Sequence, residues 1–215
     1  MKRRHIVWDW NGTLLDDLPV VIEAANVSLG QYGEGPIDED DYRNHFTRPI
    51  RAFYDSLFDR PVTDMEWHGL NDKFHDEYYS RVDHAHLTID TIDALNRVEM
   101  EGWGQSLLSM SPQEWLLDVV GRKGVAQRFS LIDGLRGPTG GLKATHLAQH
   151  LETQDLDPAA TVVVGDTPDD AVAARHVGAQ PILYDGGSHH LPTLKGMGAP
   201  VAHTLVEAVA IATTL

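Results

Sequence analysis

The sequence predicts an α/β fold, a doubly wound parallel sheet covered by helices, with an inserted helical domain. Short apolar runs alternate with amphipathic helical patterns through the second half of the chain. Residues 10–105, which separate the first apolar run from the second, carry helical periodicity instead. They far exceed the roughly 12 residues that a strand–helix–strand crossover needs. The 215 residues suit one core with one insertion.

Five apolar runs of three or four residues predict the strands. They are apolar on both faces, which is typical of a parallel sheet covered on both sides. The runs are residues 5–8, 106–108, 129–132, 161–164 and 181–184. Helices are expected between the last four, over residues 112–120, 143–151 and 168–177. Ser111 is expected to cap the first of these helices, with Pro112 at its first position, and Gly178 to end the last.

The long interval after the first strand is predicted to be helical. Its apolar spacing indicates helices over residues 19–29, 39–46, 50–58, 64–80 and 91–101, with turns at residues 33–36 and 60–61. The simplest division assigns residues 1–15 and 86–215 to the α/β core domain and residues 16–85 to a helical cap domain. The helix over residues 91–101 then leads back to the sheet.

Composition narrows the class of ligand. Lys and Arg number 17 against 32 Asp and Glu, a formal charge of −15. Such a surface argues against nucleic acids and anionic membranes as partners, and favours a small anionic ligand bridged by a metal. The chain has no cysteine, which excludes disulfides and thiolate chemistry. With no pattern typical of a signal peptide or a membrane span, we expect a cytoplasmic protein, a monomer or homodimer.

Polar residues at the predicted strand ends indicate one site. Asp9 ends the first strand, Ser109 the second and Asp166 the fourth, while Lys143 begins the helix before the fourth. Ligands bind outside the carboxyl ends of strands in an open parallel sheet, so these side chains should converge. Two carboxylates suit Mg²⁺, Ser109 and Lys143 suit phosphate oxygens, and a carboxylate can be the nucleophile. Gly12 lets the loop after the first strand turn tightly.

Two of these segments resemble motifs of the haloacid dehalogenase (HAD) superfamily. Residues 9–14 read Asp-Trp-Asn-Gly-Thr-Leu and resemble its first motif, which in the phosphatases is Asp-x-Asp-Gly-Thr after a strand. Residues 165–170 read Gly-Asp-Thr-Pro-Asp-Asp and are similar to its fourth motif. Ser109 and Lys143 fall where the second and third motifs belong. The helical insertion resembles the small cap of phosphoglycolate-phosphatase-like members, and the core a Rossmann-like one.

The resemblance implies a metal site and a reaction. Asp9 would be both the nucleophile and a Mg²⁺ ligand, with the backbone carbonyl of Asn11 and the carboxylate of Asp166 as further ligands. Asp170 would not bind the metal directly but would orient water bound to it, unless Asp169 takes that role. The implied protein is a Mg²⁺-dependent phosphatase that hydrolyses a small phosphorylated metabolite through an aspartyl-phosphate.

The resemblance also implies the substrate contacts. Gly12, Thr13, Ser109 and Lys143 would surround the phosphate. Arg48 lies between two predicted cap helices, where it could bind a substrate anion.

Asn11 departs from the phosphatase motif. The aspartate usual at this position protonates the leaving oxygen and then activates water, a contribution of about 10²–10⁴-fold that an amide cannot make. Asn11 therefore indicates a slow phosphatase for leaving groups that need little protonation, or one in which Asp16, Asp17 or a cap histidine substitutes. Deamidation of Asn11 before Gly12 would also create a carboxylate.

Three other functions remain open. The chain could be a catalytically weak phosphate-binding or regulatory protein. It could also be a phosphonatase-like C–P hydrolase, although such enzymes use a cap lysine and the cap contains only Lys73. A dehalogenase is less favoured because the acidic fourth motif is retained.

Overall fold

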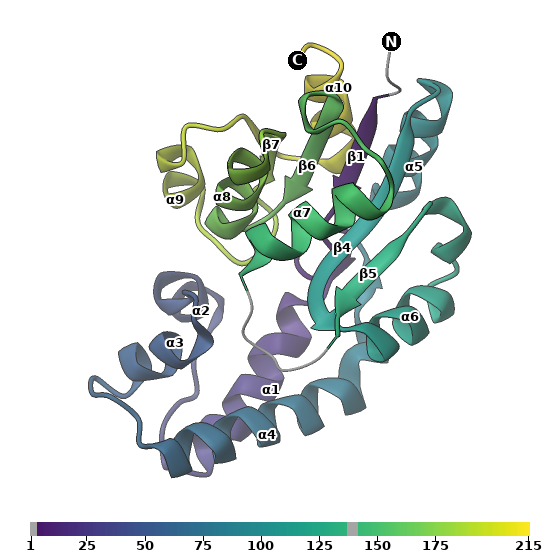
Figure 1. The fold of residues 1–215 in the computed structure, drawn as a ribbon. Coiled ribbons are helices and arrows are strands. Elements are labelled where there is room, and N and C mark those ends of the chain that lie inside the picture. The colour runs from purple at the N-terminus through teal and green to yellow at the C-terminus, as the bar shows by residue number, and fades with distance from the viewer. Residues whose placement is uncertain (1–3, 137–141) are drawn as a thin grey trace.

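A six-stranded parallel sheet forms the centre of the computed structural model, which describes residues 4–136 and 142–215 (Figure 1). The strands are β1 (His5–Trp8), β4 (Gly104–Pro112), β5 (Ile132–Leu135), β6 (Thr161–Gly165), β7 (Gln180–Tyr184) and β8 (Val201–Ala202). Their order is β5-β4-β1-β6-β7-β8, and every pairing is parallel. The chain order reverses between β1 and β6, which is the switch point of a doubly wound sheet. The predicted α/β fold is confirmed.

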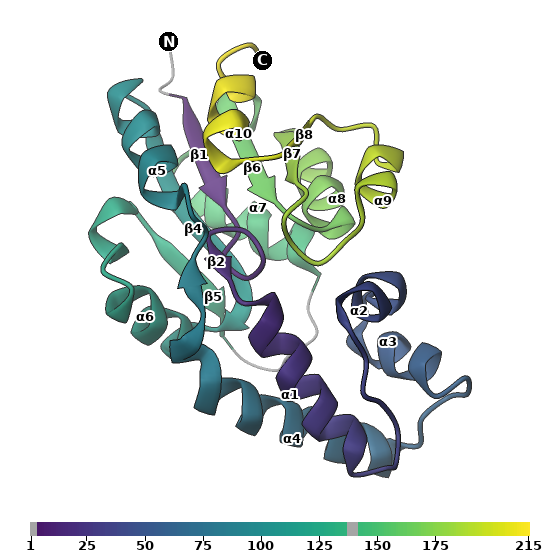
Figure 2. The same ribbon diagram turned by 180° about the vertical axis from the view of Figure 1, so that it is seen from behind.

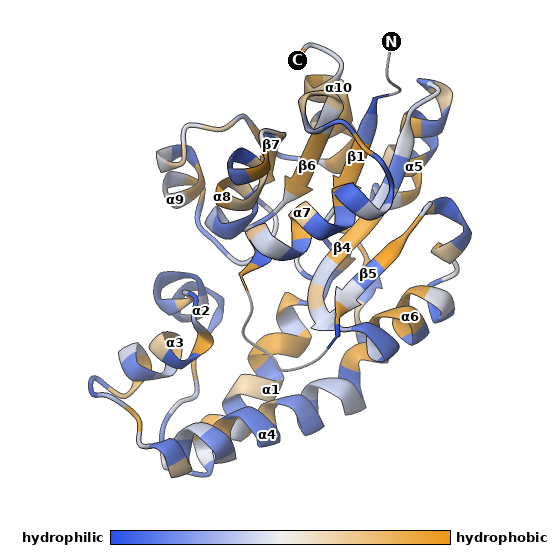
Figure 3. Ribbon diagram, in the orientation of Figure 1, coloured by the Kyte–Doolittle hydropathy of each residue, from blue (hydrophilic) through white to orange (hydrophobic). Residues whose placement is uncertain are grey.

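Helices cover both faces of this sheet (Figures 1 and 2). One face, which includes Val7, is covered by α7 (Lys143–Thr153) and α8 (Pro168–Val177). The other face, which includes Ile6 and Trp8, is covered by α5 (Thr91–Met100), α6 (Gln113–Arg122) and α10 (Leu205–Ala212). Alternate residues of β1 thus face opposite layers, and the central strands carry apolar stretches at Ile6–Trp8, Leu107–Leu108 and Val162–Val164 (Figure 3). Helix α9 (Leu191–Gly196) packs at the edge through Leu194.

Four helices between β2 and β3 form a separate layer beside the sheet (Figure 1). We call α1 (Leu18–Gly30), α2 (Glu39–His45), α3 (Ile50–Leu57) and α4 (Asp64–Arg81) the helical segment. It has its own apolar cluster, which includes Leu29, Tyr42, Phe53 and Leu70. The strands β2 (Leu15–Asp16) and β3 (His86–Leu87) pair antiparallel where the chain leaves and re-enters the core. Three short 3₁₀ helices cover Val82–His84, Ala126–Arg128 and Pro158–Ala160.

The structure corrects three local predictions. The third strand is Ile132–Leu135, so the expected strand over residues 129–132 is wrong by three residues. Strand β4 continues to Pro112, which places Ser109 inside it, at a shift in register between Leu108 and Pro112. Helix α6 begins at Gln113 with Pro112 as its N-cap. Ser111 is not the cap, because its hydroxyl donates to Asn11 instead.

The remaining helices lie within two residues of their predicted limits. Elements β2, β3, β8, α9 and α10 were not predicted from the sequence. No helix in the part of the chain that the structure describes is long and apolar enough to cross a membrane.

Candidate active site

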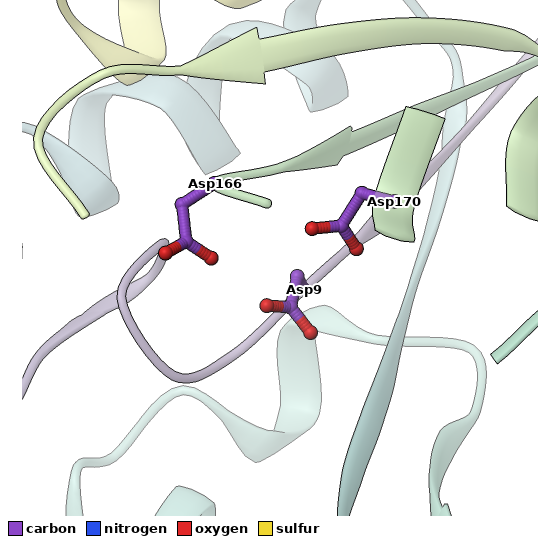
Figure 4. Close-up of side chains that lie close together, drawn as sticks. All are labelled: Asp9, Asp166 and Asp170. Carbon is purple, nitrogen blue, oxygen red and sulfur yellow. The ribbon is translucent and has the colours of Figure 1, made fainter. Parts of the chain in front are cut away.

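Three carboxylates meet where β1 and β6 end (Figure 4). Asp9 follows β1 and Asp166 follows β6, and the backbone N–H of Asp9 extends the pairing by donating to Val164 O at 2.8 Å. Asp170 lies one turn into α8. Oxygen atoms of the three side chains lie within 4.8 Å of one another, and all three residues are buried. The sequence prediction that the strand ends converge therefore describes the observed geometry.

Lys143 holds two of these carboxylates from the first position of α7. Its Nζ donates to Asp9 Oδ1 at 2.7 Å and forms an ion pair with Asp170 Oδ1. Burial alone would lower the pKa of Lys143, but the charges of Asp170 and Asp9 raise it above its usual value. The residue is 5% exposed and stays an ammonium ion, so it orients Asp9 as a charged donor.

Negative charge exceeds positive charge in this cluster. Burial raises the pKa of Asp9 to about 8, Lys143 opposes this, and the charges of Asp170 and Asp166 add to it. Burial and Asp170 raise the pKa of Asp166 to about 6. Carboxylates that resist ionisation in this way are stabilised by a cation, and oxygen atoms are the ligands that Mg²⁺ prefers. The donor set therefore fits a divalent metal ion.

Asp170, and not Asp169, is the fourth-motif aspartate that faces Asp9. Its Oδ2 accepts hydrogen bonds from the backbone N–H of Thr167 at 2.9 Å and from the Thr167 hydroxyl at 2.7 Å, a capping box at the start of α8. Burial would raise the pKa of Asp170, but Lys143 and Thr167 lower it overall. Asp169 is only partly buried. Of the two aspartates, Asp170 is therefore the one that lies in the carboxylate cluster.

The loop after β1 packs directly against Asp166. Gly12 has φ +69°, and a Cβ added to it would lie 2.5 Å from Asp166 Oδ2. Thr13 donates to Asp166 Oδ1 at 3.4 Å, and the backbone N–H of Ser188, after β7, donates to Oδ2 at 2.7 Å. Gly12 is therefore required both for its backbone conformation and for this close approach.

The side chains of Asn11 and Asp17 contact each other. Asn11 Nδ2 donates to Asp17 Oδ2 at 2.7 Å, and Gly12 N donates to Asp17 Oδ1 at 2.8 Å. Burial raises the pKa of Asp17, and hydrogen bonds from Tyr78, Asn11 and Gly12 oppose that rise. Asp16 is exposed in β2. Of the two aspartates considered as substitutes for the missing carboxylate, Asp17 is the one in contact with the loop.

The helical segment supplies residues that the sequence did not indicate. Tyr78 of α4 donates to Asp17 Oδ2 at 2.5 Å and accepts from Asn11 Nδ2 at 2.7 Å. Tyr42 of α2 is buried, and burial together with the charges of Asp17 and Asp166 raises its pKa well above the usual value. No sequence signal links these tyrosines to residues so distant along the chain.

Arg48 does not contact the carboxylate cluster. It is exposed between α2 and α3 and forms no hydrogen bond or ion pair with any residue that the structure describes. Helix α2 itself does contact the core beside Asp166, since Arg43 Nε donates to Gly187 O at 3.0 Å. The Phe46 and His189 rings lie 5.3 Å apart at the same contact.

Comparison with known proteins identifies the family to which this fold and this carboxylate cluster belong. Residues 6–184 match the model of the haloacid dehalogenase-like hydrolase family, so the chain belongs to that family. The resemblance inferred from the sequence motifs, and the prediction of a hydrolase, are confirmed.

Relatives and solved structures agree with this assignment. The chain is 26% identical over 206 residues to a phosphoglycolate phosphatase of Vibrio cholerae, covering 92% of this chain and 88% of that one. It is 27% identical over 175 residues to a phosphoglycolate phosphatase of Synechococcus elongatus, covering 80% and 79%. A haloacid dehalogenase-like protein from Streptococcus pneumoniae has the same fold, with a TM-score of 0.85, 20% identity and 97% and 98% coverage. A predicted phosphatase from Clostridium acetobutylicum superposes with a TM-score of 0.87 at 15% identity, over the full length of both chains.

Proposed function

We propose that this protein is a Mg²⁺-dependent phosphatase that hydrolyses a small phosphorylated metabolite through an aspartyl-phosphate on Asp9. The observation that carries the proposal is a buried aspartate at the sheet's switch point, held by Lys143 within a cluster of excess carboxylates. The helical segment is proposed to be the cap that covers this site, because α2 and α4 both contact the loops beside it. Phosphatases among its relatives support the reaction class.

The metal would be held by Asp9, Asp166 and the backbone carbonyl of Asn11, with Asp170 orienting its water ligands. When bound, it would neutralise charge on the phosphate and on the transferring phosphoryl group. Because burial raises the pKa of Asp9 to about 8, this carboxyl would release a proton at neutral pH when such a cation binds.

Asp9 acts in two steps. A carboxylate oxygen of Asp9 attacks phosphorus, and the bond between phosphorus and the leaving oxygen breaks. Water then attacks the aspartyl-phosphate, which releases inorganic phosphate and restores the carboxylate. Lys143 orients Asp9 and offers positive charge to the phosphoryl oxygens, while Ser109 and the Gly12–Thr13 loop complete the phosphate contacts.

Asn11 directs the choice of substrate. Its amide cannot protonate the leaving oxygen, so substrates whose leaving group is a weak base, such as acyl phosphates, are favoured over alkyl phosphates. Phosphoglycolate, the substrate named for the relatives, is an alkyl phosphate and is the second candidate. A C–P hydrolase is disfavoured because Lys73, the one lysine of the segment, is paired with Glu77 at 2.5 Å.

A phosphate-release screen over acyl, sugar and nucleotide phosphates and phosphoglycolate, with and without Mg²⁺, tests the proposal. Asp9→Asn should abolish metal-dependent release. Asp169→Asn, a matched control at the partly buried neighbour of Asp170 that lies outside the carboxylate cluster, should leave release unchanged. Phosphate binding without turnover on any substrate would instead identify a phosphate-binding protein, and turnover that survives Asp9→Asn would reject the aspartyl-phosphate.

A further inference from the structure

The side chain of Asn11 is saturated with hydrogen bonds from the protein. Nδ2 donates to Asp17 Oδ2 and to the Tyr78 hydroxyl, both at 2.7 Å. Oδ1 accepts from the Ser111 hydroxyl at 2.8 Å and from the Ser109 hydroxyl at 3.3 Å. A carboxamide has two N–H donors and two acceptor positions, and all four are used. Nothing on this side chain remains for a substrate.

The four partners come from three separate parts of the fold. Asp17 lies just before α1, Ser109 and Ser111 lie in the irregular end of β4, and Tyr78 lies in α4. Tyr78 also donates to Asp17 Oδ2 at 2.5 Å, so the amide, the phenol and the carboxylate form a closed ring of hydrogen bonds. Asn11 therefore joins the serines of the core to a helix of the helical segment.

Packing fixes the phenol in this ring. The Tyr78 ring stacks on Phe74 with centroids 5.8 Å apart and lies 5.5 Å from Trp115 of α6. Tyr78 is 5% exposed. Its hydroxyl is thus presented to Asn11 by an aromatic cluster that spans α4 and α6.

The surroundings of Asn11 favour an amide over an ionised carboxylate. An ionised carboxylate at this position would offer no donor to Asp17 or to Tyr78, and would face Asp17 Oδ2 across a hydrogen-bond distance. The two serine hydroxyls, which donate to Oδ1, suit either group. The two hydrogen bonds that Nδ2 donates are therefore what distinguishes an amide from a carboxylate at this position.

We propose that Asn11 and Tyr78 are positioning residues: together they hold the Ser109–Ser111 segment of β4 in the geometry that binds phosphate, so that phosphate affinity depends on a hydroxyl in α4. The inference rests on the proposed function only in taking Ser109 as a phosphate ligand. The single hydroxyl hydrogen of Ser109 then turns from Asn11 Oδ1, 3.3 Å away, to the phosphate, while Ser111 keeps its bond to Oδ1. The inference assigns a role to the amide at position 11, and it makes α4 part of the phosphate site without touching the phosphate.

Tyr78→Phe tests the proposal because it removes one hydroxyl and keeps the ring. Calorimetric titration with inorganic phosphate at saturating Mg²⁺ should show a dissociation constant about 5- to 20-fold weaker, in the range of a lost hydrogen bond within a charged network. Tyr79→Phe is the matched control, since Tyr79 packs on the same Trp115 but its hydroxyl forms no hydrogen bond with any residue the structure describes. It should bind phosphate as the wild type does.

A double-variant cycle separates positioning from general destabilisation. Ser109→Ala should weaken phosphate binding, and adding Tyr78→Phe to it should cause little further loss if Tyr78 acts through Ser109. Ser111→Ala, which removes one donor from Asn11 Oδ1, gives a second and milder test, with a weakening of about two- to fivefold. Equal affinities in Tyr78→Phe and wild type, or losses that add fully in the double variant, would overturn the proposal. A wild type that binds no phosphate would instead reject the proposed function.

Discussion

Replacing Asn11 by aspartate places a second carboxylate against Asp17. The atoms concerned lie 2.7 Å apart, so two ionised groups would repel by about 6 kcal/mol at an effective dielectric constant near 20. Keeping a proton on one of them at pH 7 costs about 4 kcal/mol, because its pKa must rise by about three units. Repulsion exceeds that cost, and the pair therefore retains one shared proton at neutral pH.

A protonated carboxyl at position 11 supplies the general acid that the amide lacks. We expect Asn11→Asp to raise kcat for phosphoglycolate by about 10²-fold, the lower end of the usual contribution of general acid catalysis. The kcat for p-nitrophenyl phosphate should change little, because its leaving group needs no proton. KM should rise for both substrates, since a protonated carboxyl has one hydrogen to donate where the amide donates to both Tyr78 and Asp17. Initial rates of phosphate release between pH 5 and 9 give the ratio of the two kcat values.

Two control variants test whether the ratio of the two kcat values reports general acid catalysis by the new carboxyl. Asp9→Asn combined with Asn11→Asp should be inactive on both substrates. Exchanging the two groups, as Asn11→Asp with Asp17→Asn, keeps one carboxyl and one amide in the pair and removes the repulsion. It should lower KM relative to Asn11→Asp alone. A kcat ratio that is unchanged from wild type would refute the reasoning and show that another residue supplies the proton.

Three further outcomes follow from the site. Without metal, the folded protein keeps a proton on Asp9, whose pKa is raised to about 8, whereas the unfolded chain releases it near 3.8. The free energy of unfolding should therefore fall as pH rises from 5 to 8. Asp9 contributes about 1.4 kcal/mol per pH unit, and Asp166, whose pKa is raised to about 6, adds to the slope below pH 6. Chemical denaturation with and without Mg²⁺ measures this, and saturating Mg²⁺ should flatten the profile; a metal-free profile that rises instead contradicts the buried proton. Gly12→Ala should abolish Mg²⁺-induced stabilisation in thermal melts, because its Cβ would collide with Asp166, while an Ala variant of the exposed turn residue Gly102 should keep it. Deamidation at Asn11 should be slower in the native protein than in the unfolded chain, because Gly12 N, the attacking atom, already donates to Asp17 and to Leu15 O; equal rates by intact mass would show that the loop opens readily.

The acidic cluster could be predicted from sequence because its positions follow from strand ends. Asp9 and Asp166 each end an apolar run, and parallel strands bring their carboxyl ends to one edge of the sheet. The strand over residues 129–132 was misplaced because residues 129–135 are only partly apolar, so periodicity alone does not fix where pairing with β4 begins.

The hydrogen-bond ring around Asn11 could not be predicted. Tyr78 is 67 residues from Asn11, and its approach depends on the direction in which α4 leaves the core. The shift in register within β4 also turns Ser111 toward Asn11, where sequence spacing suggested a helix cap. Contacts of this kind depend on how the helical segment sits against the sheet, which local patterns do not encode.

The pairing of β2 with β3 allows the helical segment between them to change in length. Asp16 pairs with His86, so the chain leaves and re-enters the core at adjacent points. An insertion whose ends meet in this way can gain or lose residues without shifting β1 relative to β4, because the linkers already close on each other. Grafting a different helical unit between those two strands would then exchange the helices beside the site, and the new unit would have to present a hydroxyl where Tyr78 contacts Asn11 and Asp17.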